Sequence, residues 1–403
     1  MTWWIPLRSL LRNRRRTLLS VAIIALGTAI SLFVFGFLED SRLQIQATTV
    51  DEYGNLQIAS PALWDDTAEG YEYLIMPETE SRIRELLVGR AAITGITSQL
   101  QLPGLIAAGN QTQVVRITSQ VPENGTLNID AFVIDGRPLR TSDVAAVLIG
   151  RSLANRLGLA VGDVVTLTLT TVDGAYNATP LQIVGIYRFT SEQVELRSLF
   201  MPLSFAQRLL NTKGVDRLIV NLGSISATNA EASAIQRLLD NDALSLRVET
   251  WDDLSPFYKE LAGFFDLLFG FLTLAVFILV FFIILQVLTL AFLERTREIG
   301  TLRALGTTRG EVLSQLLMES GWLAIIGSLT GVFVGLAISL GFNALGIEWR
   351  PPGTVEASVL SVQIGLMTAL PPFGVSVVAT LLSAIFPAIQ TSRLRVVDAL
   401  RVE

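Results

Sequence analysis

The sequence contains neither cysteine nor histidine. Without cysteine the chain can form no disulfide bond and supports no thiol chemistry. Without histidine it lacks the commonest general base and metal ligand of proteins. Lysine occurs only as Lys213 and Lys259, and neither lies in a G-x-x-x-x-G-K-[ST] phosphate-binding loop. We therefore expect a chain that is not an enzyme, with no catalytic residue, no metal site and no bound cofactor of its own.

Charge is also scarce and unevenly placed. Charged residues make up 16% of the 403 residues and hydrophobic residues 51%, whereas about a quarter of residues are charged in soluble proteins. The net charge is −6, and no long basic face exists beyond the first sixteen residues, so we expect no nucleic-acid binding. The acidic pairs Asp65–Asp66 and Asp252–Asp253 are typical of solvated loops, because adjacent side chains point apart on most backbones.

The first long apolar segment is residues 18–38, which carry no charge. At 1.5 Å per residue this segment can cross a hydrocarbon core of about 30 Å. It is longer than the apolar part of a signal peptide and no A-x-A site follows, so we expect an uncleaved span. Residues 1–17 hold five arginines, no acid, Trp3 and Trp4, which predicts a cytoplasmic segment. That segment is either a topology signal alone or also a short interfacial helix.

Residues 39–260 have a different character, with 17 basic and 27 acidic residues and no apolar run of membrane length. The region is long enough to bury a core of its own. Short β-like runs alternate with amphipathic helical stretches, which is typical of an α+β or split βαβ domain. Because one span precedes it, we expect this domain outside the cytoplasm. The clearest predicted elements are strands at 164–171, 181–187, 198–201, 216–222 and 246–249, and helices at 150–157, 203–210 and 228–240.

Two further apolar segments follow this domain. Residues 261–293 exceed the length of a bilayer core, and the helix is expected to begin near Ser255–Pro256 as a stalk below the external domain. Residues 320–347 contain three glycines spaced four apart, which either admit a close partner helix or reflect the frequency of glycine in membrane helices. These glycines are Gly327, Gly331 and Gly335.

The fourth span is predicted within residues 357–389, where Pro371 and Pro372 are expected to kink the helix. Residues 348–356 form an external loop and residues 390–403 a cytoplasmic tail. The cytoplasmic pieces are basic on balance, in agreement with the positive-inside rule. The predicted fold class is an α-helical membrane protein with four transmembrane helices and a large α+β extracytoplasmic domain inserted between helices 1 and 2.

Polar residues beside the apolar segments are few. Asp266 and Glu319 fall at predicted helix ends, where an acid near the interface costs little. Gln286 is expected to make one interhelical hydrogen bond. Secondary transport therefore has little support, because the sequence shows neither a buried charge nor paired broken helices.

The most informative stretch is residues 294–311, between the second and third spans. Ile299, Leu302 and Leu305 recur every three residues, which predicts a short amphipathic helix. Acidic and basic residues three positions apart favour the same helix. The stretch is either a docking helix for a cytosolic partner or a topology anchor with solvated charges, and its apolar stripe favours docking.

Two end signals delimit this helix. Gly306 is typical of a helix C-terminus, where a left-handed conformation is needed. Thr308, with Glu311 three residues later, predicts a capping box at the start of the next helix.

These motifs resemble the permease subunits of the MacB/LolC–LolE/FtsX superfamily of ABC transporters. The stretch E-R-T-R-E-I-G-T-L-R-A-L-G at 294–306 is similar to that family's E-R-x-x-E-I-G-x-L-R-A-x-G signature. The tail at 392–403 is similar to its closing A-R-x-x-P-x-x-A-L-R-x-E motif, with Val397 where proline is usual. Residues 148–167 and 201–210 resemble motifs of its external domain.

The resemblance implies mechanotransmission between the cytosol and the external domain. Two permeases, identical or paralogous, would form a dimer above two ABC ATPase subunits, and those ATPases would bind ATP and magnesium on a separate chain. The helix at 294–306 would be the coupling helix, with Ile299, Leu302 and Leu305 as its apolar seat. The residues assigned to ATPase coupling are Glu294, Arg295, Arg297, Glu298, Ile299, Gly300, Leu302, Arg303, Leu305 and Gly306.

Within the superfamily, the P-P-G loop at 351–353 resembles Lol-type lipoprotein-releasing permeases. The interval 172–180 is too short for the carrier-recruiting loop of LolC-like subunits, which favours a LolE-like subunit or a general exporter permease. The expected setting is a bacterial inner membrane, with both termini in the cytoplasm. Expected partners are membrane lipids and a lipoprotein, lipid or periplasmic carrier protein. The alternatives are a MacB-type efflux permease and an FtsX-like signalling scaffold that activates an envelope protein.

Overall fold

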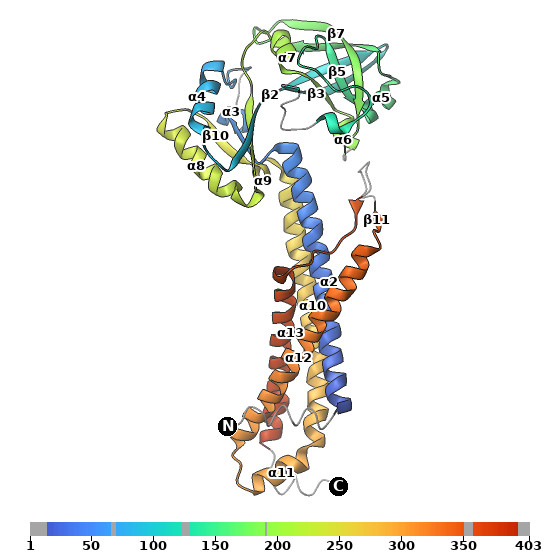
Figure 1. Cartoon of the computed structure of the whole chain (residues 1–403), viewed down its shortest axis with the longest axis vertical. Helices are drawn as coiled ribbons and strands as arrows, with labels where there is room; N and C mark the ends of the chain where they lie inside the picture. The colour runs from blue at the N-terminus through green and yellow to red at the C-terminus, as the bar shows by residue number, and fades with distance from the viewer. Residues whose placement is uncertain (1–13, 66–69, 123–128, 190–191, 350–357, 394–403) are drawn as a thin grey trace. The chain divides into compact units, whose positions relative to one another are not determined.

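The computed structural model describes residues 14–65, 70–122, 129–189, 192–349 and 358–393. The chain divides into a helical unit and a β-rich unit (Figure 1). The β-rich unit comprises Ile45–Glu260 with Trp349–Ser358, and the helical unit takes the rest. The interfacial helix predicted in residues 1–17 falls largely outside the described residues, as do most of the tail motif and the P-P-G loop.

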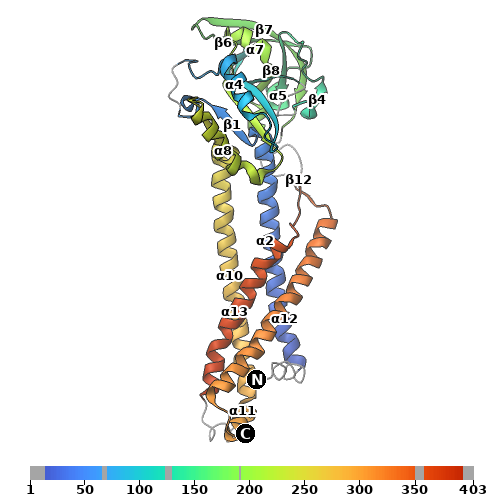
Figure 2. The same cartoon turned by 60° about the vertical axis from the view of Figure 1, so that its left-hand side comes forward.

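The long helices of the chain are α2 (Arg14–Tyr53), α10 (Pro256–Glu294), α12 (Arg309–Ala344) and α13 (Leu366–Ser392). Among the described residues, these four helices are long and apolar enough to cross a membrane. They run side by side in both views of the helical unit (Figures 1 and 2). The short helix α11 (Thr296–Ala304) lies at one end of this bundle.

Two of these helices extend beyond the predicted apolar segments. Helix α2 continues from residue 38 to Tyr53, so the β-rich fold does not begin at residue 39 as expected. Residues 39–53 lack glycine and proline and favour a helix, although their polarity removes them from the hydropathy signal. The helix ends at Gly54, where the backbone adopts a positive φ of 74°. Helix α10 begins at Pro256, which confirms the predicted stalk start.

The glycines of α12 pack directly against α2. A Cβ atom at Gly331 would lie 2.5 Å from the Cβ of Thr28 and 2.6 Å from the carbonyl oxygen of Ala25. A Cβ atom at Gly335 would lie 3.1 Å from the Cα of Ala29. The close-approach interpretation of the glycine repeat is therefore confirmed, and the partner helix is α2 of the same chain.

The fourth long helix, α13, was expected within residues 357–389; it begins at Leu366, and the segment that precedes it is extended. The N–H of Gln363 donates a hydrogen bond to the carbonyl oxygen of Gly36 in α2, at 2.9 Å. The N–H of Val362 donates to Oδ1 of Asn343 in α12, and Nδ2 of Asn343 donates to the carbonyl oxygen of Val362. These external partners replace the intrahelical hydrogen bonds, so the segment lies across α2 and α12 and α13 begins only at Leu366.

The β-rich unit is built on one mixed sheet. The described strands follow the order β10-β1-β9-β2-β3-β8-β5-β7-β4, and β6 pairs with β2 and β7. The strands are β1 (Leu56–Ala59), β2 (Ile93–Ala108), β3 (Gln111–Gln120), β4 (Val133–Gly136), β5 (Ala146–Gly150), β6 (Val164–Thr170), β7 (Tyr176–Tyr187), β8 (Ser198–Pro202), β9 (Arg217–Leu222) and β10 (Arg247–Thr250). The helices are α3 (Pro61–Trp64), α4 (Pro77–Leu87), α5 (Arg151–Leu157), α6 (Glu192–Glu195), α7 (Leu203–Leu210), α8 (Thr228–Asn241) and α9 (Trp251–Leu254).

This arrangement confirms the predicted α+β class, and the expected strand–helix alternation from 198 to 249 appears as β8, α7, β9, α8 and β10. Alternate strand residues and the apolar faces of α7 and α8 form the larger of the two apolar clusters described in this unit. Leu100, Ile117, Leu218 and Ile235 are among its fully buried members, each at most 1% exposed. The unit thus has a hydrophobic core of its own.

The ends of α2 and α10 are joined within the β-rich unit by two paired strands. Strand β1 follows α2, and β10 leads through α9 into α10. The two strands are antiparallel, with Leu56 opposite Thr250. The N–H of Trp251 also donates to the carbonyl oxygen of Asn55 at 3.2 Å. The β1–β10 pair is called the root below, because both helices enter the unit there.

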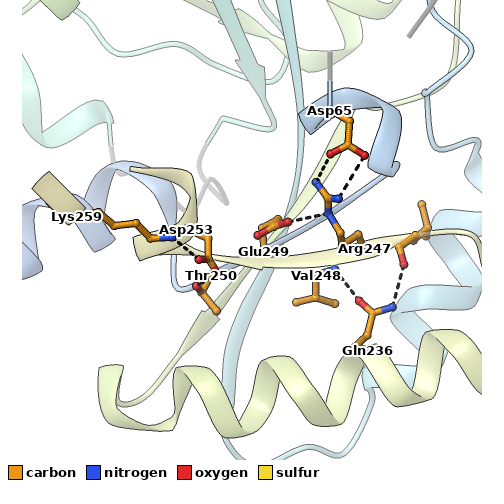
Figure 3. Close-up of polar contacts among 9 residues, drawn as sticks. Asp65, Gln236, Arg247, Val248, Glu249, Thr250, Asp253 and Lys259 are labelled. Atoms are coloured by element: carbon orange, nitrogen blue, oxygen red, sulfur yellow. Dashed lines mark hydrogen bonds and ion pairs between the residues drawn. The ribbon is translucent and has the colours of Figure 1, made fainter. Parts of the chain in front are cut away.

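Ion pairs hold β10 and the start of α10 at the root (Figure 3). Arg247 contacts Asp65 at 3.0 Å and Glu249 at 2.7 Å, and Lys259 contacts Asp253 at 2.6 Å. Burial by itself raises the pKa of the Asp253 carboxyl, but hydrogen bonds from Lys259 and a neighbouring threonine hold that pKa below its ordinary value. This contribution to stability is present above the unfolded pKa of about 3.9 and is lost as pH falls through the lower folded value.

We expect Gly331→Ala to destabilise the helical unit, because the new Cβ overlaps Thr28 and Ala25. Overpacking of this kind costs about 1–3 kcal/mol. The matched control is Gly341→Ala on the same helix, where a Cβ meets no atom within 4 Å. The control should be neutral or stabilising by up to about 1 kcal/mol. Unfolding in mixed micelles measures both, and equal stability of the two variants contradicts the α2–α12 contact.

Candidate functional site

Helix α11 is separated from α10 by a single bent residue. Helix α10 ends at Glu294, Arg295 has φ −97° and ψ 6°, and α11 begins at Thr296. The hydroxyl of Thr296 donates to the carbonyl oxygen of Leu293 at 2.6 Å, so a side chain takes part in the hydrogen bonding at the bend. The predicted short helix is confirmed, and the residue at which the chain turns is called the elbow below.

The far end of α11 is closed by the two signals seen in the sequence. Gly306 has φ 101°, its N–H donates to the carbonyl oxygen of Arg303, and the N–H of Thr307 donates to that of Leu302. This pair of bonds is a Schellman motif. The hydroxyl of Thr308 and the carboxylate of Glu311 then form the reciprocal bonds of a capping box at the start of α12.

The elbow is held by an ion pair to α12. Nη1 of Arg295 lies 2.9 Å and 2.8 Å from the two carboxylate oxygens of Glu319. The two side chains are 15% and 11% exposed. Burial alone lowers the pKa of the Arg295 guanidinium, but the Glu319 carboxylate more than compensates and raises it. A second contact joins Nε of Arg295 to Glu298 at 3.3 Å.

The inward face of α11 packs on the membrane helices. Ile299 is 6% exposed and belongs to an apolar cluster with residues of α10, α12 and α13. Gly300 beside it is also buried. At the other end of α11, Nη1 of Arg303 donates to the carbonyl oxygen of Ser392, the last residue of α13, at 3.3 Å. Helix α11 is therefore fixed to three of the long helices, α10, α12 and α13. The cluster partners of Ile299 include Leu288, Phe292, Val312, Leu316 and Ala388.

The outward face of α11 carries the exposed side chains. Leu305 is 81% exposed and Leu302 is 41% exposed. Arg297, Glu298 and Glu294 are exposed beside them. We call the exposed residues Arg297, Glu298, Leu302 and Leu305 the coupling face.

The ten residues singled out in the sequence thus divide into two groups. Arg295 and Ile299 make contacts inside the helical unit, which differs from the expectation that they contribute to an outward docking surface. Helical spacing predicted that Ile299 shares an apolar stripe with Leu302 and Leu305. Spacing alone does not show which residues of that stripe are buried by other helices such as α12. Gly300 is buried beside Ile299, and the half-buried Arg303 donates to Ser392. The exposed members are Glu294, Arg297, Glu298, Leu302, Leu305 and Gly306.

Glu319 is the residue that sequence reasoning placed wrongly. It was expected at a helix end, but it lies within α12, ten residues after Arg309, and is 8% exposed. Its expected place near the membrane interface stays a prediction. The sequence did mark Glu319 as unusual, because it is the one charged residue in the segment 312–347. Among the described residues, no group of three or more acidic side chains is placed to hold a metal ion.

Comparison with known proteins agrees with this architecture. Residues 17–238 match the MacB-like periplasmic core domain family, and residues 270–396 match the FtsX-like permease C-terminal family. These two matches identify a membrane permease of the ABC transporter class, in agreement with the apolar helices and the inserted α+β domain. The chain belongs to the MacB-like and FtsX-like family of ABC transporter permeases.

Several relatives are similar over different parts of the chain. The macrolide export ATP-binding/permease protein MacB 2 of Aeromonas hydrophila is 23% identical over 99% of this chain, which spans 60% of that protein. The uncharacterized ABC transporter permease YknZ of Bacillus subtilis is 23% identical over 61% of this chain and 65% of its own length. The periplasmic region of MacB from Actinobacillus actinomycetemcomitans aligns with a TM-score of 0.37 and 14% identity, covering 50% of this chain and 91% of that one.

We expect Gly306→Pro to open the C-terminal turn of α11. Proline fixes φ near −65°, whereas this position needs 101°, and it removes the N–H that bonds to Arg303. The local cost is about 3 kcal/mol. Hydrogen exchange of the α11 amides should accelerate while the amount of protein in the membrane stays unchanged.

The matched control is Gly310→Ala, because Gly310 follows the same turn and a Cβ there meets no atom within 4 Å. Exchange in this control should resemble that of the wild type. Wild-type protection of α11 in Gly306→Pro would show that the Schellman turn does not hold the helix.

Proposed function

We propose that this chain is the permease subunit of an ATP-driven ABC transporter, with α11 as the coupling helix to an ATPase on a separate chain. The observation that carries the proposal is the division of α11 into two faces. Its inward face is fixed to α10, α12 and α13. Its outward face exposes Leu302 and Leu305. A helix that served only as a topology anchor would need no such exposed leucines.

The coupling face has the chemistry of a docking surface. Two exposed leucines flanked by charged residues resemble the apolar centre and polar rim of protein interfaces. The partner ATPase supplies the ATP and magnesium sites. The permease contributes no catalytic group, so its part is mechanical.

Movement of α11 has a continuous path toward the β-rich unit. Helix α10 is a single helix from Pro256 to Glu294 and spans about 58 Å at 1.5 Å per residue. It follows directly from α9 and β10, whose strand is paired with β1. A change in the direction of α10 therefore acts on the root, and through it on the sheet that continues from β1.

The proposed setting is a bacterial inner membrane, with a dimer of permeases and two ATPases. Both termini and α11 face the cytoplasm, which is supported by the basic residues before α2 and around α11. The β-rich unit faces the periplasm or the exterior. The family match of this unit to a periplasmic core domain supports that side.

The proposed cargo is an amphiphile, either a lipoprotein or another lipid-like molecule, which the external domain expels. A MacB-type efflux permease is the second candidate. It is favoured by the similarity to a macrolide export protein over 99% of this chain.

We expect Leu305→Asp to remove ATPase binding, because the substitution places a charge at the most exposed apolar residue of the coupling face. Loss of a central interface side chain of this kind weakens binding at least about 30-fold. The measurement is co-purification of the full chain in nanodiscs with each ABC ATPase of the source organism. The control is Val88→Asp, a 79% exposed apolar residue of the β-rich unit. Equal ATPase recovery from the two variants argues against α11 as the docking helix.

The absence of cysteine allows a direct test of topology. We expect a single cysteine at Leu305 to resist a membrane-impermeant maleimide in cells with a permeable outer envelope, and to react once the inner membrane is opened. A single cysteine at Val88 should react in both cases. Both side chains are highly exposed, so burial does not account for a difference. Labelling of Leu305→Cys in cells with an intact inner membrane contradicts the proposed orientation.

A further inference from the structure

The elbow between α10 and α11 is tied to a third helix by a charge contact. Arg295 is the residue between the last residue of α10 and the first residue of α11. Its guanidinium reaches both carboxylate oxygens of Glu319, at 2.9 Å and 2.8 Å. The contact therefore joins the turning point of one chain segment to the interior of α12.

Buried leucines lie on both sides of Glu319 along α12. In α12, Leu316 and Leu323 lie one turn before and after Glu319 and are 3% and 5% exposed. A carboxylate buried beside apolar residues is unfavourable unless it is paired with a positive charge. Removal of one partner leaves the other charge buried and uncompensated. The exposed Glu298 offers Arg295 a second, longer contact, but Glu298 cannot satisfy Glu319. The Arg295–Glu319 ion pair therefore stabilises the one position of the elbow, relative to α12, in which both charges are paired.

The apolar packing of α11 does not specify this position equally well. The contacts of Ile299 resist separation of α11 from the bundle, but hydrophobic attraction is non-directional and permits sliding. A short charge contact to both oxygens of one carboxylate is lost after a small displacement. When α11 moves, either α12 moves with it or the pair breaks.

Helix α12 in turn is packed closely against α2. The Gly327, Gly331 and Gly335 face of α12 contacts α2 closely: a Cβ would overlap α2 at Gly327 and Gly331 and would be tightly packed at Gly335. Helix α2 leads into β1, and α10 is preceded by β10, the strand that pairs with β1. A movement of α11 thus has two paths: one through α10, and one through the Arg295–Glu319 pair, α12 and α2.

We infer that Glu319 is a positioning residue that makes α12 and α2 move together with α10 and α11, so that both strands of the root are driven at once. The inference rests on the proposed function and adds a residue and a second path to it. Without Glu319 the ATPase would still dock, because the coupling face lies elsewhere on α11. Its movement would then reach α12 and α2 only through apolar packing, such as the contact of Gly27 in α2 with Val280 in α10.

The experiment uses the full chain in nanodiscs, spin-labelled at introduced cysteines in place of Leu305 and Phe333. These side chains are 81% and 65% exposed, on α11's C-terminal end and on α12. We expect a narrow distance distribution in the otherwise wild-type chain and a broad or shifted one in Glu319→Gln. The exchanged double variant Arg295→Glu/Glu319→Arg should restore the narrow distribution. The control Arg297→Gln removes an exposed arginine of the same helix and should leave the distribution unchanged.

The second measurement uses the ATPase recovered with the wild-type chain, without spin labels. Glu319→Gln should bind that ATPase with unchanged affinity, while the rate of ATP hydrolysis in the complex changes about tenfold, a usual size for coupling between sites. The exchanged double variant should return the rate toward the wild-type value. A purely structural defect would lower affinity and rate together and would not be rescued by exchange.

The outcomes separate the inference from the proposed function. If no ATPase binds the wild-type chain, the proposed function is wrong, and the spin-label distances alone decide whether the pair positions α11. If the ATPase binds and Glu319→Gln leaves both the distances and the hydrolysis rate unchanged, the inference is wrong and the proposed function stands. Failure of the exchanged variant to restore either measurement also overturns the inference.

Discussion

A buried charged side chain or backbone polar group is costly unless a partner satisfies it, and this constraint determines how the long helices contact one another. At one end of the bundle, the constraint is met by the contact between Arg295 and Glu319. At the extended segment before α13, it is met by Asn343 and by the carbonyl oxygen of Gly36, which accept hydrogen bonds from backbone N–H groups. In each case the two partners belong to different helices or segments. The ion pair and hydrogen bonds that satisfy these polar groups therefore also hold the helices together.

The glycines of α12 also join two helices, through close backbone packing. Glycine would be a poor choice for helix stability alone, since it costs up to about 1 kcal/mol relative to alanine. Here it permits the backbone of α2 to approach α12 more closely than any side chain would allow. Dispersion contacts and close backbone packing replace the hydrophobic effect, which cannot drive association inside lipid. Helices α2 and α12 are thereby suited to act as one body, while α10 keeps most of its apolar surface exposed, with 11% of its most apolar stretch buried.

Most of the layout was predictable because it depends on local signals. Hydropathy located the four long helices, and alternation located the strands from β6 to β10. Gly306 and the Thr308–Glu311 box marked the turn after α11, because caps are decided by residues within one turn. Three features needed the fold. The polar continuation of α2 to Tyr53 has no hydropathy signal, the extended segment before α13 depends on partners in α2 and α12, and the inward position of Arg295 depends on an acid 24 residues later.

The division of α11 also explains why its sequence mixes charges with an apolar stripe. Helix α11 has apolar side chains on two faces, with Leu302 and Leu305 outward and Ile299 inward, as the proposed docking by one face and packing by the other require. A single stripe at a spacing of three drifts around a helix of 3.6 residues per turn, so Ile299 and Leu305 point in directions that differ by about 120°. One stripe can therefore serve both contacts. The same drift that makes the stripe ambiguous in the sequence lets this short helix and its C-cap residue Leu305 present one apolar surface outward and another to the helical bundle.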